Sequence, residues 1–271
     1  MIRSTLICLS VACLVYPSVA LAHGPQMQVT TSGGKLVTNS VFLDEDAVNG
    51  YGPITDPKRV YVMPLTNSLG DGQYFTRPNS SPSFYSGPGF AAGLSNLELG
   101  SKINLTFLNG LTLWNGSSFV DPGLEQLQAF RGSHASPSAT LSTVDGGPSG
   151  SLNVVASFTP GAGAHDTTRF RLLGDGSSPT SPSDDGVYLV SMQLTSTSTA
   201  PAVSASDPYY FLLFKNAPSS QVDAALGSLL ASQGIDPSLV QVVPEPTSLG
   251  LLGMGGLLMG LVAIRRRLQK S

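Results

Sequence analysis

Short apolar or alternating segments, separated by Gly, Pro, Asn and Asp, fill the chain from residue 26 to residue 207. A strand exposes successive side chains on opposite faces, and these separating residues favour turns. Only 11% of residues are charged, while the chain has 30 Gly and 20 Pro, a mixture that long helices rarely tolerate. The pattern predicts a mainly β fold, namely an antiparallel β-sandwich of jelly-roll or immunoglobulin-like type. The candidate strands are residues 27–31, 35–43, 59–63, 102–108, 112–114, 140–144, 152–158, 167–173, 187–195 and 209–214.

Two of these segments carry more specific signals. Residues 187–195 alternate most clearly, with apolar side chains on one face and Ser191 and Gln193 on the other, so we expect one face in the core. Asn109-Gly110 separates two candidate strands, and this dipeptide favours the type I′ turn of a hairpin. The sequence therefore predicts a hairpin between residues 102–108 and 111–114.

One amphipathic helix is predicted at residues 218–234, because apolar residues recur there at helical spacing. Ser219 or Ser220 is the expected N-cap and Gly234 the expected stop. We expect this helix to cover an edge or end of a sandwich formed by residues 23–217. Residues 235–243 would then be a linker to a C-terminal segment at residues 244–271.

The N-terminus has the composition of a signal peptide over residues 1–22. Arg3 precedes a short apolar run at residues 6–19, and Ala20-Leu21-Ala22 provides the small-x-small pattern that signal peptidase requires. Cleavage after Ala22 would expose His23 as the first residue. A membrane-anchoring helix is the alternative, although the run is short for a bilayer.

The C-terminus has three consecutive parts. Pro244-Glu245-Pro246 comes first, an uncharged apolar segment at residues 248–264 follows, and Arg265-Arg266-Arg267 opens a basic tail at residues 265–271. As a helix the apolar segment would be about 25 Å long, close to the thickness of the hydrocarbon core. Arginines at its end resist translocation. We expect a transmembrane helix that leaves the body of the protein outside.

This arrangement resembles the PEP-CTERM sorting signal of Gram-negative bacteria that produce extracellular polysaccharide. The resemblance implies an exosortase as processing partner, cleavage near the motif, and Glu245 as the recognition carboxylate. It further implies anchoring in inner-membrane lipid facing the periplasm, then a cell-surface or extracellular location, with exopolysaccharide as a possible partner. An ordinary stop-transfer anchor is the alternative.

Charge and cysteine content exclude several classes of function. Five of the 14 Lys and Arg lie in the two terminal segments, which leaves 9 basic against 16 acidic residues between positions 23 and 243. Nucleic-acid binding needs clustered basic residues, so we exclude that partner. Both cysteines, Cys8 and Cys13, lie in the N-terminal apolar run, so the mature chain is expected to have no disulfide.

Segments of the body resemble a group of uncharacterised surface-anchored proteins of planctomycetes and related bacteria. The residues concerned are 163–166, 170–176, 185–190 and 206–211. Members often begin the mature chain with histidine and carry His-x-His at the region of His165, which suggests metal binding. The resemblance implies His23 and His165 as candidate metal ligands, although Asp166 and Thr167 follow His165 here.

Evidence for cofactors and catalysis in the sequence is sparse. Copper at His23 and calcium at the acidic loops 175–177 and 183–186 are open possibilities, but solvated turns explain such loops equally. No nucleophile elbow or HExxH motif occurs, and neither Glu98 nor Glu125 can be assigned as a general acid without geometry. We therefore expect no cofactor and no enzyme activity, and the alternative is an envelope carbohydrate-active or metal-dependent enzyme. Aromatic residues for a sugar-stacking platform, or for core packing, are Trp114, Tyr51, Tyr85 and Tyr210.

Overall fold

The computed structural model describes residues 26–40, 58–67, 74–76, 83–86, 97–133, 136–144, 147–149, 151–155, 164–174 and 183–242. All of them belong to one compact unit, residues 23–243. The expected signal peptide, apolar segment 248–264 and basic tail lie outside the described residues. In the part of the chain that the structure describes, no helix combines the length and apolar character needed to cross a membrane.

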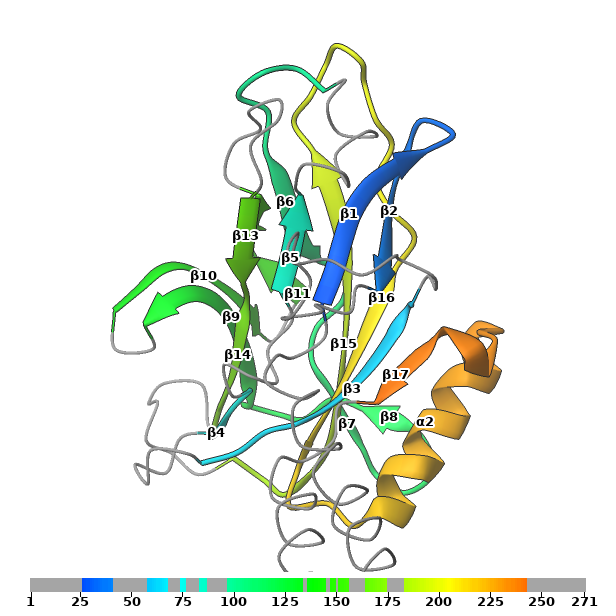
Figure 1. The fold of residues 1–271 in the computed structure, drawn as a ribbon. Helices are drawn as coiled ribbons and strands as arrows, with labels where there is room; N and C mark the ends of the chain where they lie inside the picture. The colour runs from blue at the N-terminus through cyan, green and yellow to red at the C-terminus, as the bar shows by residue number, and fades with distance from the viewer. Residues whose placement is uncertain are drawn as a thin grey trace, which may run out of the picture. The chain divides into compact units, whose positions relative to one another are not determined.

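The fold is mainly β, as predicted, and its strands form three sheets (Figure 1). The largest sheet has the order β12 (Ser151–Val155), β6 (Ile103–Phe107), β15 (Gly186–Ser196), β16 (Tyr209–Lys215), β3 (Val60–Pro64) and β17 (Val240–Val242), with β7 (Thr112–Trp114) and β8 (Phe119–Val120) joined to it through β15. The four-stranded sheet comprises β13 (Ala164–Thr167), β5 (Ser83–Ser86), β1 (Gln26–Ser32) and β2 (Lys35–Ser40). The five-stranded sheet comprises β11 (Gly147–Ser149), β10 (Ser136–Val144), β9 (Gln126–Ser133), β14 (Arg169–Leu173) and β4 (Tyr74–Phe75). The jelly-roll or immunoglobulin-like sandwich stays a prediction.

The largest sheet is mixed, not wholly antiparallel. β16 pairs with β3 in parallel, and β17 pairs with the other edge of β3, also in parallel. Two parallel strands need a connection that crosses the face of the sheet. Helix α2 (Ser219–Gln233) and the short 3₁₀ helix η3 (Pro237–Leu239) make that connection between β16 and β17.

Both faces of the largest sheet are consequently buried at β3 and β16. On β16, Phe211 and Leu213 belong to a core shared with the other two sheets, whereas Tyr210 and Leu212 contact the cluster beneath α2. The α2 side of that cluster consists of Val222, Ala225 and Leu229. The helix thus covers a face of the sheet, and the expectation that it covers an edge or end is corrected. The parallel connection is the physical reason.

Strand β15 agrees with its predicted alternation. Tyr188, Val190, Met192 and Leu194 all belong to the core shared by the three sheets. The opposite face carries Ser191 and Gln193, as expected, but also Val187, which packs in the cluster under α2.

The predicted hairpin at Asn109-Gly110 is wrong. β6 and β7 both pair with β15, at Met192–Ser196 and at Tyr188–Leu189 respectively, so they follow one another along the same edge. A type I′ turn requires positive φ at both central residues, and neither Asn109 nor Gly110 has it. The Asn-Gly pair instead lies in a bulge, because residues 108–111 between the two strands stand opposite only residues 190–191 of β15. Positive φ occurs at both Gly33 and Gly34, in the tight turn between β1 and β2.

The observed ends of α2 agree only in part with those predicted from the sequence. Gly234 ends the helix in the left-handed conformation with φ 59°, and its N–H donates to the Leu230 carbonyl oxygen, as a glycine stop does. Neither Ser219 nor Ser220 is the N-cap. That position is Pro218, and no side-chain hydrogen bond caps the helix.

Candidate functional site

The C-terminal end of the described chain is attached to the largest sheet. Ile235 is buried in the cluster under α2, and the Asp236 carboxylate accepts a hydrogen bond of 2.8 Å from the Ser238 N–H at the start of η3. The Arg59 N–H donates to the Leu239 carbonyl oxygen at 2.8 Å, and β17 then pairs with β3. The expectation that residues 235–243 are a linker is therefore corrected through Val242, because this segment completes the sheet.

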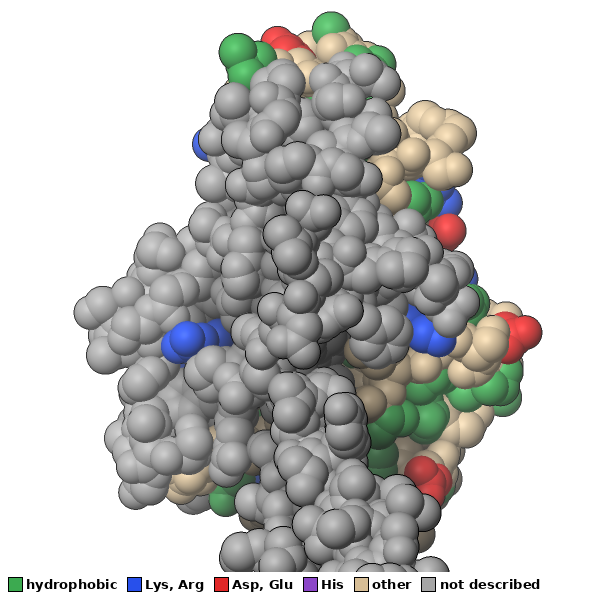
Figure 2. Space-filling view, in the orientation of Figure 1, with side chains coloured by type: hydrophobic (Ala, Val, Ile, Leu, Met, Phe, Trp, Pro, Cys, Tyr) green, Lys and Arg blue, Asp and Glu red, His purple; other side chains and the backbone are tan. Residues whose placement is uncertain are grey.

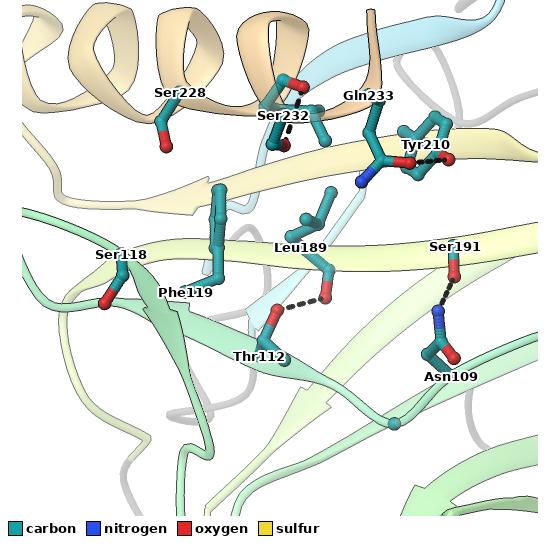
Figure 3. Close-up of a pocket in the computed structure, with 12 residues that line it drawn as sticks. Asn109, Thr112, Ser118, Phe119, Leu189, Ser191, Tyr210, Ser228, Ser232 and Gln233 are labelled. Atoms are coloured by element: carbon teal, nitrogen blue, oxygen red, sulfur yellow. Dashed lines mark hydrogen bonds between the residues drawn. The ribbon is translucent and has the colours of Figure 1, made fainter.

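A cavity of about 420 Å³ lies between α2, the face of β15 and β16, and the β7–β8 hairpin. This volume falls in the range of roughly 300–1,000 Å³ typical of small-molecule sites. Figure 3 shows side chains of α2 on one side of the cavity and side chains of the β6–β8 region on the other. The described residues that line it are Asn109, Gly110, Thr112, Ser118, Phe119, Leu189, Ser191, Tyr210, Ser228, Leu229, Ser232 and Gln233.

The bulge between β6 and β7 shapes one wall of this cavity. Asn109 Nδ2 donates a hydrogen bond of 2.9 Å to Ser191 Oγ, and Thr112 Oγ1 donates to the Leu189 carbonyl oxygen at 3.3 Å. On the opposite side the Tyr210 hydroxyl donates to Gln233 Oε1 at 2.8 Å. These hydrogen bonds hold the β6–β7 connection to β15 and the end of α2 to β16, and β15 and β16 form the base of the cavity. Nothing in the sequence signals the cavity directly, since the Asn-Gly pair that helps to form it is typical of a hairpin.

A family model for the PEP-CTERM protein-sorting motif matches residues 242–267. The chain carries a PEP-CTERM sorting tail. The match begins at the last residue of β17, and it implies an exported protein that an exosortase processes at the membrane. A comparison with curated proteins finds no match. The resemblance of the body to surface-anchored planctomycete proteins stays a prediction.

Several residues that the sequence singled out in this chain lie outside the described residues. They are Ala20, Ala22, His23, the motif Pro244-Glu245-Pro246, and Arg265 to Arg267. His165 lies in β13, where it is opposite Tyr85 of β5. No group of three or more His, Cys, Asp or Glu residues suited to a metal ion occurs within the described ranges. Metal binding by His23 and His165 stays a prediction.

Of the four aromatic residues considered for a sugar platform, Tyr51 lies outside the described residues and Tyr85 lies in β5, while the other two occupy different environments. Trp114 is buried, and its ring packs against Phe119 at a centroid distance of 5.1 Å. Tyr210 has its ring in the cluster under α2 and its hydroxyl at the cavity. Core packing therefore accounts for Trp114, while Tyr210 contributes to both core and cavity.

A second polar cluster organises the acidic loop 183–186. The buried Lys215 ammonium donates to the Ser183 carbonyl oxygen, forms an ion pair of 3.0 Å with Asp185 and lies 4.4 Å from the centre of the Tyr74 ring. The hydrogen bond from Lys215 holds the pKa of Asp185 below its usual value. These contacts give Asp185 a structural role in the turn. Calcium binding by this loop stays a prediction, and the other candidate loop, residues 175–177, lies outside the described residues.

Glu125 extends this cluster into the protein. Its carboxylate accepts hydrogen bonds from the Asp184 N–H and from the Tyr188 hydroxyl, which lies 2.9 Å from each carboxylate oxygen and also 2.7 Å from the Asp184 carbonyl oxygen. Burial raises the pKa of Glu125, and the two hydrogen bonds oppose that rise. Burial and the nearby Glu125 charge also raise the pKa of Tyr188, so its hydroxyl stays protonated. Glu125 is not among the residues that line the cavity.

Proposed function

We propose that the mature protein has a structural or binding role in the cell envelope or extracellular matrix, associated with exopolysaccharide and without catalytic activity. One observation carries the proposal: β17 completes the folded sheet at Val242, the residue at which the sorting motif begins. Cleavage near Pro244-Glu245-Pro246 would therefore leave every described strand intact. The sorted product would be the complete β domain.

The tail also limits the distance between the domain and the bilayer before cleavage. Only residues 243–247 separate β17 from the expected transmembrane helix at 248–264. Even fully extended, they reach no farther than about 20 Å. We propose that the domain is held at the outer surface of the inner membrane until an exosortase releases it toward the cell surface or the exterior.

The chemistry of the cavity supports a role in binding or structure over a catalytic one. General acid–base catalysis requires a group that titrates near the working pH. Among the described residues that line the cavity there is no Asp, Glu, His, Lys or Arg, and Tyr210 has its pKa raised by burial. This lining supplies neither paired carboxylates nor a metal-binding set.

Intact-mass measurement of the protein recovered from its native host tests the proposal. We expect loss of residues 1–22 and of the segment after the Pro-Glu-Pro motif, with the product in the surface or polysaccharide fraction. Glu245→Gln should retain the tail and stay in the membrane fraction. Asp223→Asn, which removes an exposed carboxylate on α2, is the matched control and should be processed as the wild type is.

Two results would contradict the proposal. One is a wild-type protein that keeps its tail in a host with an active exosortase. The other is equal processing of the Glu245→Gln variant and the control.

A further inference from the structure

The lining of the α2 cavity is neutral but rich in hydrogen-bonding groups. Its described side chains are hydroxyls of Ser, Thr and Tyr, amides of Asn and Gln, and the apolar groups Phe119, Leu189 and Leu229. Figure 2 shows hydrophobic and neutral polar side chains over the region of α2, with acidic groups at only a few points. A ligand suited to this lining is uncharged, because a phosphate or carboxylate would find no cation there.

Part of this hydrogen-bonding capacity is available to a ligand. Gln233 Oε1 accepts from the Tyr210 hydroxyl, which leaves the amide N–H groups of Gln233. Asn109 donates from Nδ2 to Ser191, which leaves its carbonyl oxygen. Within the described part of the chain, the hydroxyls of Ser118 and Ser228 form no hydrogen bond. The cavity therefore presents donors and acceptors side by side, as a polyhydroxylated ligand requires.

Apolar groups complete the match to a sugar. Phe119 is half-buried at the cavity, where its ring is supported by Trp114. A pyranose carries hydroxyls around its rim and C–H groups on its faces, so it fits a site that combines amides and hydroxyls with an aromatic ring. The acidic excess of residues 23–243 also disfavours an anionic polymer.

We infer that the cavity between α2 and the β6–β8 edge binds a neutral saccharide unit of an extracellular polysaccharide. This inference depends on the proposed function for the placement of the domain outside the cell. It assigns the ligand contacts to the amides of Asn109 and Gln233, to the hydroxyls of Ser118 and Ser228, and to the ring of Phe119. It does not depend on cleavage of the tail.

The test uses the full chain purified in detergent micelles. Binding is measured by isothermal titration with neutral oligosaccharides of glucose, galactose, mannose and N-acetylglucosamine, with oligosaccharides of uronic acids, and with neutral and acidic fractions of the host polysaccharide. We expect saturable binding of at least one neutral probe and weaker binding of the acidic ones. A peptide pool of matched size is included.

Two variants and a control locate the binding site. Gln233→Glu replaces the amide donors by a carboxylate of the same shape and should weaken binding about tenfold or more, because a lost hydrogen bond leaves a desolvated polar group unpaired. Ser228→Phe fills the cavity and should abolish binding. Gln221→Glu makes the same amide-to-carboxylate change at another position on α2 and should leave the affinity unchanged. Near-ultraviolet circular dichroism checks that each variant is folded.

The inference is overturned by an absence of binding to all neutral probes, by a preference for uronic acids or peptides, or by equal affinity of the folded Ser228→Phe variant and the wild type. Failure of the proposed function is distinguished by the mass measurement. A processed, surface-located protein that binds no sugar refutes the cavity assignment alone.

Discussion

The Tyr188 hydroxyl offers a sharp test of the buried polar cluster. Tyr188→Phe removes one donor to the Glu125 carboxylate and keeps the ring in the core. A hydrogen bond to a charged group contributes about 2 kcal/mol, so the variant should lose about that much free energy of unfolding. For a domain of this size the melting temperature should fall by about 4–8 °C. Thermal unfolding followed by circular dichroism measures both quantities.

The free energy of unfolding that the Tyr188→Phe variant loses should depend on pH in a defined direction. Glu125 has its pKa raised from 4.5 in the folded protein, so its contribution to stability is complete below pH 4.5 and is lost as the pH rises through the folded pKa. Without the Tyr188 donor that pKa rises further. The difference between wild type and variant should therefore be smallest in acid and grow as the pH rises.

Tyr210→Phe is the matched control. Its hydroxyl donates to the neutral side chain of Gln233, which is exposed, so we expect a loss of only about 0.5–1 kcal/mol with no such pH dependence. If the two variants lose equal stability, or if the Tyr188→Phe loss is constant from pH 4 to pH 8, Glu125 does not act as the charged partner of Tyr188.

Three substitutions and one truncation test the α2 to β17 unit, each by thermal or urea unfolding. Leu229→Ala removes a buried side chain from the cluster under α2 and should cost about 2–5 kcal/mol; a loss below 1 kcal/mol would contradict the packing. Gly227→Ala, in open space within the helix, should stabilise by about 0.5–1 kcal/mol, whereas Gly234→Ala, at φ 59°, should destabilise. If both glycine substitutions change the stability in the same direction, the assignment of Gly234 as the helix end is refuted. A chain that ends after residue 239 should be less stable than one that ends after 243, because only the longer chain retains β17; equal melting temperatures would make β17 dispensable.

Prediction from the sequence succeeded where the signal is local. The alternation in residues 187–195 placed Tyr188 and Leu194 in the core, because a period of two fixes which side chains share a face. Gly234 was identified as the helix stop because few residues other than glycine tolerate its backbone conformation. The tripartite C-terminus was recognisable because proline, an uncharged segment and arginines each have a direct physical effect.

Prediction failed where distant segments compete for the same partners. Asn109-Gly110 has the composition of a hairpin turn, yet β15 offers its edge to both flanking strands, and the pairing with β15 takes the place of the hairpin. The same bulge makes a wall of the cavity, so the candidate binding site was missed together with it. Residues 235–242 have the composition of a linker, but the last three of them pair with an edge of β3 and form strand β17.

Composition and periodicity by themselves indicated that this chain is mainly β and that its body is acidic, and the order of residues at its C-terminus resembles the sorting tail that the family match identifies. These properties follow from the local sequence and do not depend on contacts with other parts of the folded chain. Only the tertiary structure decided that α2 covers a face of the largest sheet, that β17 closes its edge, and that a neutral cavity lies between them. The reason is that strand order and parallel pairing are set by contacts between segments far apart in the chain, which no local pattern encodes.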